Sequence, residues 1–470
     1  MGCSMLMCSV LNVQHSTFNA QPPPTPHLLA RLLSRHCGIA AGHLSPVFSP
    51  PMARIHLHTL GCRLNQAETE SIAQDFRRAG HEIVADADQA DLLVVNTCSV
   101  TANAGAKSRR ASSRARPDQR VVVTGCHSQL QAADFSRCDL IIPNEDKHRF
   151  VEKTLQELNL ADATDTSTEV APLYPLLTGN TRAFVKIQDG CDFRCTFCIS
   201  TVARGASRSR PAEDVLEEVA TLVRDGCREV VLTGVNSGSY LHPPDTDLGG
   251  LLERILTETE IERVRLSSLE PWNFRTAWAT LWERFEDRLC AHLHMSLQSG
   301  STGVLQRMAR PYTPDHYRRK LDEVRARIPL VGVTTDLIVG FPGETDAEHE
   351  ESLQFVEALD LAGGHVFTYS PRPGSEAATW PGQFPKTVKE QRYREMKRCV
   401  SAAAESFRQN LLGRTLPVLW ETVQADGVVS GLSGNYVRVH APPGSAQPNT
   451  ITPTTLDRIE DDRLWGQPTA

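Results

Sequence analysis

Three cysteines lie within one short segment, KIQDGCDFRCTFCISTVARG, at Cys191, Cys195 and Cys198. Three thiolates can hold three irons of a cubane iron–sulfur cluster, which leaves the fourth iron open to a substrate or cofactor. A structural zinc site needs a fourth ligand, and no other Cys or His lies in this segment. The spacing therefore favours a cluster with one open iron, and zinc with a distant fourth ligand stays the alternative.

Three more cysteines each follow an apolar run that predicts a strand. Cys62 follows IHLHTLG, Cys98 ends LLVVNTC and Cys126 ends VVVTGC. Parallel strands end at one edge of a sheet, and ligands bind outside that edge. We therefore expect the three thiols to meet there. The alternative is three unrelated buried thiols, because free cysteine is often buried.

The segments around these cysteines predict an α/β architecture in three parts. Residues 52–160 alternate strands with helices, which indicates an open, mostly parallel sheet. Residues 182–413 hold six βα units and predict a partial (β/α)6 TIM-like barrel, open at one side to a large substrate. Residues 414–470 predict a small all-β barrel with Gly and Pro turns. Residues 161–181 predict a linker.

The composition of the 470-residue chain sets limits on its class. The formal charge of −7 gives no sign of a nucleic-acid partner, and no apolar run reaches the roughly 20 residues of a membrane span. The 13 cysteines are scattered and odd in number, which predicts reduced thiols and a cytoplasmic protein. Residues 1–51 contain no Asp or Glu; we expect a disordered or spurious extension, with a targeting segment as the alternative. Four isolated cysteines are interpreted as core residues, namely Cys138, Cys227, Cys290 and Cys399.

These residues carry a resemblance to a known family. The cysteine segment resembles the signature of the radical S-adenosylmethionine (SAM) superfamily. Other segments resemble the methylthiotransferases in order and spacing: GCRLNQAETE, VVNTCSVTANAGAKSRR, VTGCHSQ, LTGVNSGSY, RLSSLEP, HLHMSLQSGSTGVLQRMAR and DLIVGFPGET. The last part is similar to a TRAM domain, so the resemblance covers residues 52 to about 466. KIQDGC, NQAETE and CSVT most resemble the threonylcarbamoyladenosine tRNA methylthiotransferases of the MtaB type; Asp192 departs from the more common Asn.

The resemblance implies an enzyme that adds a methylthio group to carbon 2 of N6-threonylcarbamoyladenosine beside the tRNA anticodon. It implies SAM and two 4Fe–4S clusters, one held by Cys191, Cys195 and Cys198 and the other by Cys62, Cys98 and Cys126. Its partners would be tRNA and an electron-donor protein; we expect a monomer that binds no membrane, and no catalytic side chain is singled out. Alternative substrates are N6-isopentenyladenosine in tRNA and a ribosomal-protein aspartate. An RNA-binding protein with structural zinc is the alternative from another class.

Other strand ends of the predicted barrel are candidates for holding SAM. The candidate residues are Thr233, Gly234, Ser267, Ser268, Glu270, Gly340 and Gly343. The alternative is that these short motifs are tight βα turns, which need glycine for their backbone.

Two basic runs without acids, KSRRASSRAR and ARGASRSR, lie beside Cys98 and Cys198 and are candidates for contacts with RNA phosphates. The candidate residues are Lys107, Arg109, Arg110, Arg114, Arg204, Arg208 and Arg210. The alternative is a solvated helix face, the usual role of a charge run. The predicted C-terminal barrel is a further candidate for holding part of the tRNA.

Overall fold

The computed structural model describes residues 52–160, 181–242 and 246–469. The expected N-terminal extension, and all of the expected linker except Thr181, lie outside these ranges. Within these ranges, no helix combines the length and apolarity that crossing a membrane requires.

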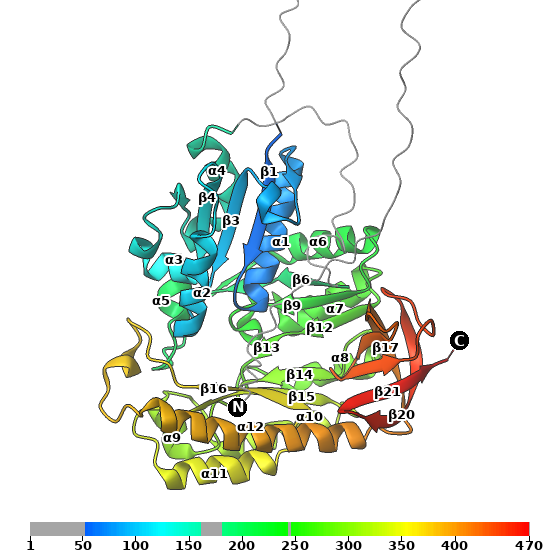
Figure 1. The fold of residues 1–470 in the computed structure, drawn as a ribbon. Helices are drawn as coiled ribbons and strands as arrows, with labels where there is room; N and C mark the ends of the chain where they lie inside the picture. The colour runs from blue at the N-terminus through cyan, green and yellow to red at the C-terminus, as the bar shows by residue number, and fades with distance from the viewer. Residues whose placement is uncertain (1–51, 161–180, 243–245, 470) are drawn as a thin grey trace, which may run out of the picture. The chain divides into compact units, whose positions relative to one another are not determined.

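The N-terminal part is a five-stranded parallel sheet with helices on both faces (Figure 1). The strand order is β2-β1-β3-β4-β5. The strands are β1 (Arg54–Thr59), β2 (Glu82–Ile83), β3 (Leu92–Thr97), β4 (Arg120–Gly125) and β5 (Leu140–Ile141). The helices are α1 (Arg63–Arg78), α2 (Ala102–Ser112), α3 (Cys126–Leu130) and α4 (Phe150–Glu157). Every residue of the central strand β3 is buried, as its unbroken apolar run predicts.

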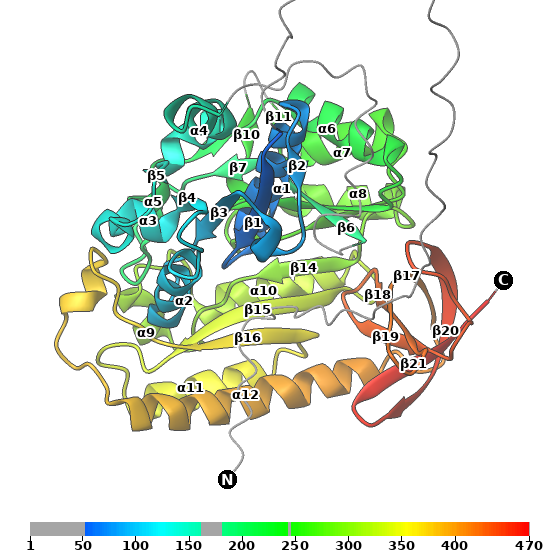
Figure 2. The same cartoon turned by 45° about the horizontal axis from the view of Figure 1, so that its top comes forward.

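The central part is a partial barrel of parallel strands in chain order (Figure 2). Its strands are β6 (Arg182–Lys186), β9 (Glu229–Thr233), β12 (Arg263–Leu266), β14 (His292–Met295), β15 (Gly332–Val339) and β16 (Gly363–Thr368). The third strand is interrupted at Ser267 and continues as β13 (Ser268–Leu269), which pairs with β14. All six strand segments expected from the sequence are therefore confirmed, whereas the interruption of the third strand was not predicted.

Helices cover the barrel strands because one stripe of each helix is apolar. On α6 (Ala212–Arg224), the buried side chains Val215, Leu216, Val219 and Leu222 recur at helical spacing. The other helices are α5 (Ser200–Arg204), α7 (Leu248–Glu258), α8 (Thr280–Arg284), α9 (Thr302–Arg307), α10 (Pro314–Arg325), α11 (Asp346–Glu357) and α12 (Lys386–Gln409). Helix α1 of the N-terminal part packs onto the barrel through Ala67, which shares a small cluster with Phe184 and Val231.

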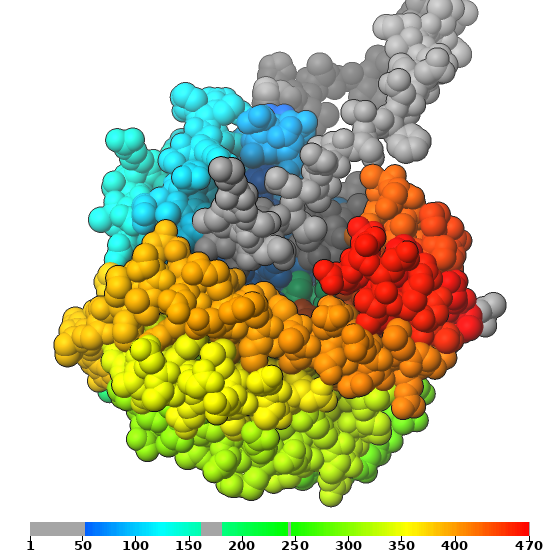
Figure 3. Space-filling view, turned by 60° about the horizontal axis from the view of Figure 1, so that its bottom comes forward, coloured from blue at the N-terminus to red at the C-terminus, as the bar shows by residue number. Residues whose placement is uncertain are grey.

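The C-terminal part is a closed five-stranded barrel that follows α12; Figure 3 shows α12 and these strands on one face. Its strands are β17 (Thr415–Val423), β18 (Val429–Ser433), β19 (Arg438–Ala441), β20 (Ile451–Glu460) and β21 (Arg463–Pro468). They close in the order β17-β18-β19-β21-β20 around a core that includes the fully buried Trp420.

Buried charges attach this small barrel to the partial barrel. Glu229 accepts from Arg263 at 2.5 Å and from Arg265 at 2.7 Å. The same guanidinium groups donate to the backbone carbonyls of Leu432 at 2.9 Å and Ser433 at 3.0 Å. Burial alone would raise the pKa of Glu229, but the nearby guanidinium groups lower it to about 2. Because each guanidinium group has partners in both barrels, the two barrels are joined by satisfied polar contacts.

One tyrosine contacts all three parts of the described chain. Tyr436, between β18 and β19, stacks on His292 of the partial barrel with ring centroids 4.3 Å apart. Its hydroxyl accepts a hydrogen bond from Arg63, the first residue of α1. Arg265 lies over the Tyr436 ring at 5.2 Å from its centroid.

Candidate functional site

Three of the candidate cysteines lie at the carboxyl-terminal edge of the N-terminal sheet; we call Cys62, Cys98 and Cys126 the sheet set. Cys62 immediately precedes α1, Cys98 follows β3 and Cys126 begins α3 after β4. The strands β1, β3 and β4 are parallel neighbours, so the topology brings these positions to one edge. The Cys62 thiol lies 3.9 Å from Asn65 Oδ1, and the same oxygen accepts from Arg204, which also donates to the Cys126 sulfur.

Two glycines allow neighbouring strand ends to approach each other closely at this edge. Gly61 precedes Cys62 with φ of +103°, and a Cβ atom there would lie 2.6 Å from the Cys98 sulfur. Gly125 precedes Cys126 with φ of +102°, and a Cβ atom there would lie 2.4 Å from the Thr97 carbonyl oxygen. Any larger residue would push the cysteines apart, which explains the two Gly-Cys pairs.

The other candidate cysteines lie on one loop of the partial barrel; we call Cys191, Cys195 and Cys198 the barrel set. An antiparallel pair, β7 (Gln188–Asp189) and β8 (Arg208–Ser209), closes the base of this loop. The backbone amide of Cys191 donates to the Gly205 carbonyl at 3.1 Å, and the amide of Cys198 donates to the Cys195 carbonyl at 3.0 Å. The loop is therefore ordered by its own backbone.

The thiols of the barrel set have the chemistry of unfilled metal ligands. Burial raises the pKa of Cys191 to about 11, and the neighbouring Cys198 and Cys195 raise it further. Burial also raises the pKa of Cys195, although Arg310 opposes this shift. Such thiols remain protonated at neutral pH unless a metal replaces the proton. The donor set therefore fits a metal cluster that supplies positive charge.

The spacing of the thiols bears on the zinc alternative. In residues 52–160, 181–242 and 246–469, no group of three or more His, Cys, Asp or Glu converges on a single metal-ion position. A structural zinc ion needs four ligands around one point, whereas a cubane takes each thiolate on a different iron. The described residues therefore form no preassembled site for a single metal ion.

A buried arginine adjoins one thiol of the barrel set. Arg310 is 7% exposed and donates to the Cys195 sulfur at 3.4 Å. It also forms an ion pair with Glu270, and its guanidinium lies 4.6 Å from the ring centroid of Trp272. The carboxylate and the ring fix the cation beside the thiol.

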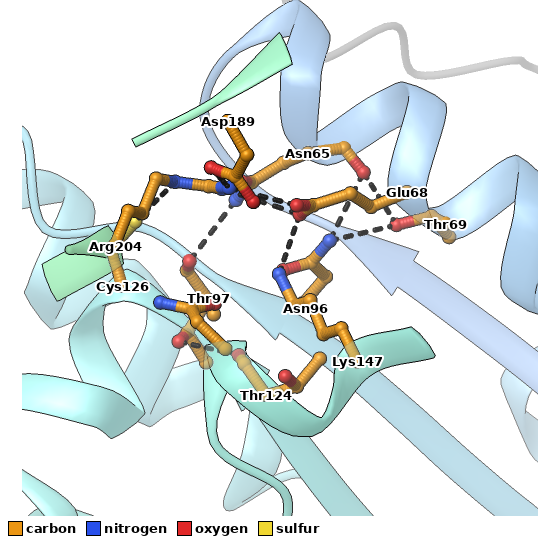
Figure 4. A network of polar contacts seen from close by, with 12 residues as sticks. Asn65, Glu68, Thr69, Asn96, Thr97, Thr124, Cys126, Lys147, Asp189 and Arg204 are labelled. Carbon is orange, nitrogen blue, oxygen red and sulfur yellow. Dashed lines mark hydrogen bonds and ion pairs between the residues drawn. The ribbon is translucent and has the colours of Figure 1, made fainter. Parts of the chain in front are cut away.

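A second buried arginine adjoins the sheet set, although it belongs to the barrel (Figure 4). Arg204, at the end of α5, is 4% exposed and donates through Nε to the Cys126 sulfur at 3.2 Å. Its other nitrogens donate to Glu68 at 2.8 Å, Asp189 at 3.0 Å and Asn65 at 2.7 Å. Because α5 begins just after Cys198, Arg204 connects the two cysteine sets.

The buried network around Arg204 carries a net positive charge. Glu68 accepts from Lys147 at 2.5 Å and from Lys186 at 3.0 Å in addition to Arg204. Burial would raise the pKa of Glu68, but the three cations hold it well below its usual range. Three cations face two carboxylates, Glu68 and Asp189, so one positive charge is in excess next to Cys126.

Two of the SAM candidates order the start of the cysteine loop. Thr233 is buried at the end of β9, and its hydroxyl accepts from Ser267 at 3.3 Å. A Cβ atom on Gly234 would lie 2.8 Å from the side-chain oxygen of Gln188. Gln188 in turn donates to the Gly190 carbonyl at 2.7 Å, directly before Cys191. Gly234 thus leaves room for a side chain that supports the barrel set.

The remaining SAM candidates lie in different settings. Glu270 pairs with Arg310, and Ser268 is half-buried in β13. Gly340 and Gly343 have φ of +69° and +73°, and the Gly340 amide donates to Glu344 at 2.7 Å. These two glycines have the backbone of a tight turn, so the turn alternative accounts for them without a ligand.

The structure divides the RNA candidates. Arg110 and Arg114 are exposed, and Lys107 is half-buried. Arg109 pairs with Asp134 at 3.1 Å, and Arg210 pairs with Glu218 at 2.6 Å. Arg208 is exposed and donates to the Arg204 carbonyl at 3.2 Å.

The interpretation of Arg204 as an RNA contact is wrong for this structure, because its guanidinium is buried among Glu68, Asp189 and Cys126. Sequence analysis also missed Glu68, although α1 carries a signal for it. Glu68 occupies a position in the stripe Leu64, Ile72 and Phe76 at helical spacing, and all these residues are buried. A lone acid in an apolar stripe indicates a buried partner cation.

Comparisons with known proteins agree with this geometry. The radical SAM superfamily matches residues 185–356, and the uncharacterized protein family UPF0004 matches residues 54–141. The chain is 34% identical over 397 residues to the threonylcarbamoyladenosine tRNA methylthiotransferase MtaB of Thermotoga maritima, covering 82% of this chain and 91% of that protein. It is 33% identical over 384 residues to the tRNA-2-methylthio-N(6)-dimethylallyladenosine synthase of Moorella thermoacetica, covering 77% of this chain and 86% of that protein.

Solved structures agree on the fold. The radical S-adenosylmethionine methyltransferase TsrM of Kitasatospora setae superposes with a TM-score of 0.54 at 14% identity, covering 69% of this chain and 75% of that chain. The match to the radical SAM superfamily implies SAM and a 4Fe–4S cluster as cofactors. Given the identity to the tRNA-modifying relatives over most of its length, the chain belongs to the radical SAM tRNA methylthiotransferase family.

Proposed function

We propose that this chain adds a methylthio group to carbon 2 of N6-threonylcarbamoyladenosine next to the tRNA anticodon, with one 4Fe–4S cluster on each cysteine set. The main observation is that two sets of three thiols, each at the carboxyl ends of parallel strands, are connected through Arg204. The relatives from Thermotoga maritima and Bacillus subtilis, each 34% identical, are named for threonylcarbamoyladenosine, which supports this substrate.

The residues around the barrel set support a protected reaction site. When bound, the cluster and SAM supply the radical chemistry at an unactivated carbon that no side chain can perform. Phe193, inside the cysteine loop, packs edge-on against Trp272 with centroids 4.9 Å apart, and Trp272 lies 5.5 Å from Tyr312. These rings exclude water from one side of the loop, while Arg310 holds a positive charge beside Cys195.

The sheet set is suited to present sulfur to the same space. Three thiolates on a cubane leave one iron without a protein ligand, where the sulfur to be transferred would bind. Arg204, six residues after Cys198 in the barrel, donates to Cys126, so one side chain of the barrel adjoins the sheet set. Cys62 is exposed, which gives this edge an opening toward solvent and substrate.

Metal analysis tests the two-cluster proposal. After anaerobic reconstitution, wild type should hold about eight irons per chain, since each cubane contains four. A triple Cys62→Ala, Cys98→Ala and Cys126→Ala variant should hold about half of that iron. About four irons in wild type would contradict the second cluster. Zinc without visible charge-transfer absorbance would favour the RNA-binding alternative.

Nucleoside analysis tests the substrate. In a strain that lacks this gene, tRNA should contain N6-threonylcarbamoyladenosine without its methylthio group, measured by mass spectrometry of digested tRNA. The relative from Moorella thermoacetica, named for dimethylallyladenosine, makes that nucleoside the second candidate. Loss of its methylthio group alone would reject the threonylcarbamoyl substrate, and intact tRNA would point to the ribosomal-protein aspartate.

We propose further that the enzyme acts as a monomer and takes electrons from a separate donor protein.

A further inference from the structure

One loop after β16 contacts the surroundings of both cysteine sets. The Ser370 hydroxyl accepts from the Ala102 amide at 3.4 Å, at the start of α2 just beyond Cys98. The Ala377 amide donates to the Thr196 carbonyl at 2.9 Å, between Cys195 and Cys198. The segment Ser370–Ala377, which we call the bridging loop, therefore runs from the sheet set to the barrel set.

Arg372 lies in the middle of the bridging loop with an unusual environment. It is 9% exposed, and its Nε is buried without a hydrogen-bond partner among the residues that the structure describes. Its backbone is fixed, because its carbonyl accepts from the Ser375 amide at 2.9 Å and from the Ser375 hydroxyl at 2.8 Å. Burial lowers the pKa of Arg372, and the fields of Cys98 and Arg109 both reach it. Ser370, two residues before it, contacts the start of α2 just beyond Cys98, so the backbone of the bridging loop holds Arg372 beside the sheet set.

Two other arginines in the site differ from Arg372, because each of them is paired with a carboxylate. Arg204 adjoins Cys126 and is held by Glu68 and Asp189. Arg310 adjoins Cys195 and is held by Glu270. Among the residues that the structure describes, no carboxylate pairs with Arg372. A buried guanidinium nitrogen without an acceptor is costly, and no described carboxylate supplies one here, so an acceptor from outside the chain would complete this position.

We propose that Arg372 binds an oxyanion of the RNA substrate between the two cysteine sets. This inference rests on the proposed function, whose substrate carries such a group on the base itself, the carboxylate of the threonylcarbamoyl substituent. The planar guanidinium fork matches a carboxylate or a phosphate, so the phosphate backbone is the second source of the same chemistry. An isopentenyl substituent has no oxyanion.

Binding measurements on the iron-loaded enzyme test this site. Anticodon-loop RNAs would carry N6-threonylcarbamoyladenosine or its neutral carboxamide, and affinity would be measured anaerobically by fluorescence anisotropy at constant salt. Arg372→Gln should weaken binding of the acid-bearing RNA about 10- to 100-fold, the range for a hydrogen bond between charged groups. Arg372→Lys should recover part of the loss. Arg319→Gln, an exposed arginine on α10, is the matched control.

Iron content and thermal unfolding are measured for each variant alongside affinity, so that each outcome has one meaning. Loss confined to the acid-bearing RNA assigns the carboxylate, and equal loss with both RNAs assigns a phosphate. Unchanged affinity for both RNAs would overturn the proposal, as would a loss of iron without a loss of affinity, because the guanidinium would then serve the thiols alone. If wild type does not methylthiolate the acid-bearing RNA, the proposed substrate fails instead, whatever the variants show.

Discussion

The two cysteine sets are built in opposite ways. The barrel set comes from one short loop that its own backbone hydrogen bonds and the β7–β8 pair hold together. The sheet set comes from three strand ends, and Gly61 and Gly125 allow their close approach. A local loop can keep its ligands together through limited disturbance elsewhere, whereas ligands from distant segments depend on the whole sheet. The sheet set is therefore the more fragile of the two.

The arginines beside the two sets show the same contrast. Arg310 and its partner Glu270 both belong to the barrel that carries the barrel set. Arg204 also belongs to the barrel, but it serves Cys126 of the N-terminal sheet through Glu68 of α1. The positive charge beside the sheet set therefore comes from Arg204, which belongs to another part of the chain. Disturbing that contact should affect one set and spare the other.

The largest effect is expected from Cys198, because both the cleavage of SAM and methylthiolation are proposed to depend on this cluster ligand. Cys198→Ala removes a thiolate from the barrel set, so reductive cleavage of SAM and methylthiolation should both become undetectable. Mass spectrometry of 5′-deoxyadenosine and of the RNA product measures the two. Cys399→Ala, which removes a half-buried thiol from α12, is the control. Persistent cleavage in Cys198→Ala would break the assignment of the barrel set.

A more selective loss is expected from Cys126→Ala. Iron should fall to about half, and methylthiolation should stop, while reductive cleavage of SAM continues. Cys138→Ala, a half-buried thiol elsewhere in the same sheet domain, should leave both activities. Equal loss of cleavage and methylthiolation would show that the two sets do not divide the reaction as proposed.

Replacing Arg204, the cation that pairs with both Glu68 and Asp189, should lower the free energy of unfolding. Arg204→Gln leaves Glu68 and Asp189 with less positive charge in a buried site, and breaking a buried pair costs about 3–5 kcal/mol. Urea unfolding measures this loss. Arg208→Gln, an exposed neighbour, should change the unfolding free energy by less than about 0.5 kcal/mol. Equal effects would mean that Arg204 does not connect the sets.

Low pH should weaken the ion pairs that Glu68 and Asp189 form with Arg204. The pKa values of Glu68 and Asp189 are lowered in the folded protein, each by Arg204 and nearby lysines against the effect of burial. The stability that they contribute is present above their ordinary pKa values, near 4, and is lost as the pH falls through the folded values. The difference in unfolding free energy between wild type and Glu68→Gln should therefore narrow below about pH 4.5. A constant difference would contradict the charged state of Glu68.

The smallest effect concerns the exposed arginines of the sheet domain that are proposed to contact RNA. Arg110→Gln and Arg114→Gln remove exposed charges near Cys98. Each should weaken RNA binding modestly and reduce the salt dependence of log K by about 1, if each contacts one phosphate. Titrations at several salt concentrations measure this slope. An unchanged slope in both variants favours the solvated-face alternative.

The fold followed from sequence patterns because the patterns are strong. The buried run at β3 and the stripe on α6 are each fixed by local periodicity. The interruption at Ser267 was not visible, because a break inside a strand depends on neighbouring strands rather than on local sequence. The clustering of the sheet set followed from topology, since parallel strands share one edge.

The sequence did not predict which partners the charged residues contact. Arg204 and Arg208 are close in one basic run, yet one is buried and the other exposed. Composition alone cannot distinguish them, because burial depends on α1 packing against the barrel. Arg372 gave no signal either, since its significance is the absence of a described carboxylate partner, which only the folded structure reveals.

The contacts of Tyr436 limit how this enzyme can be recombined. Its ring and hydroxyl engage His292 and Arg63, and Arg63 is the neighbour of Cys62. A chimera that takes its C-terminal barrel from a relative would have to import compatible residues at all three places at once. The small barrel is therefore not an interchangeable module, because its contacts reach the cysteine-bearing end of the sheet.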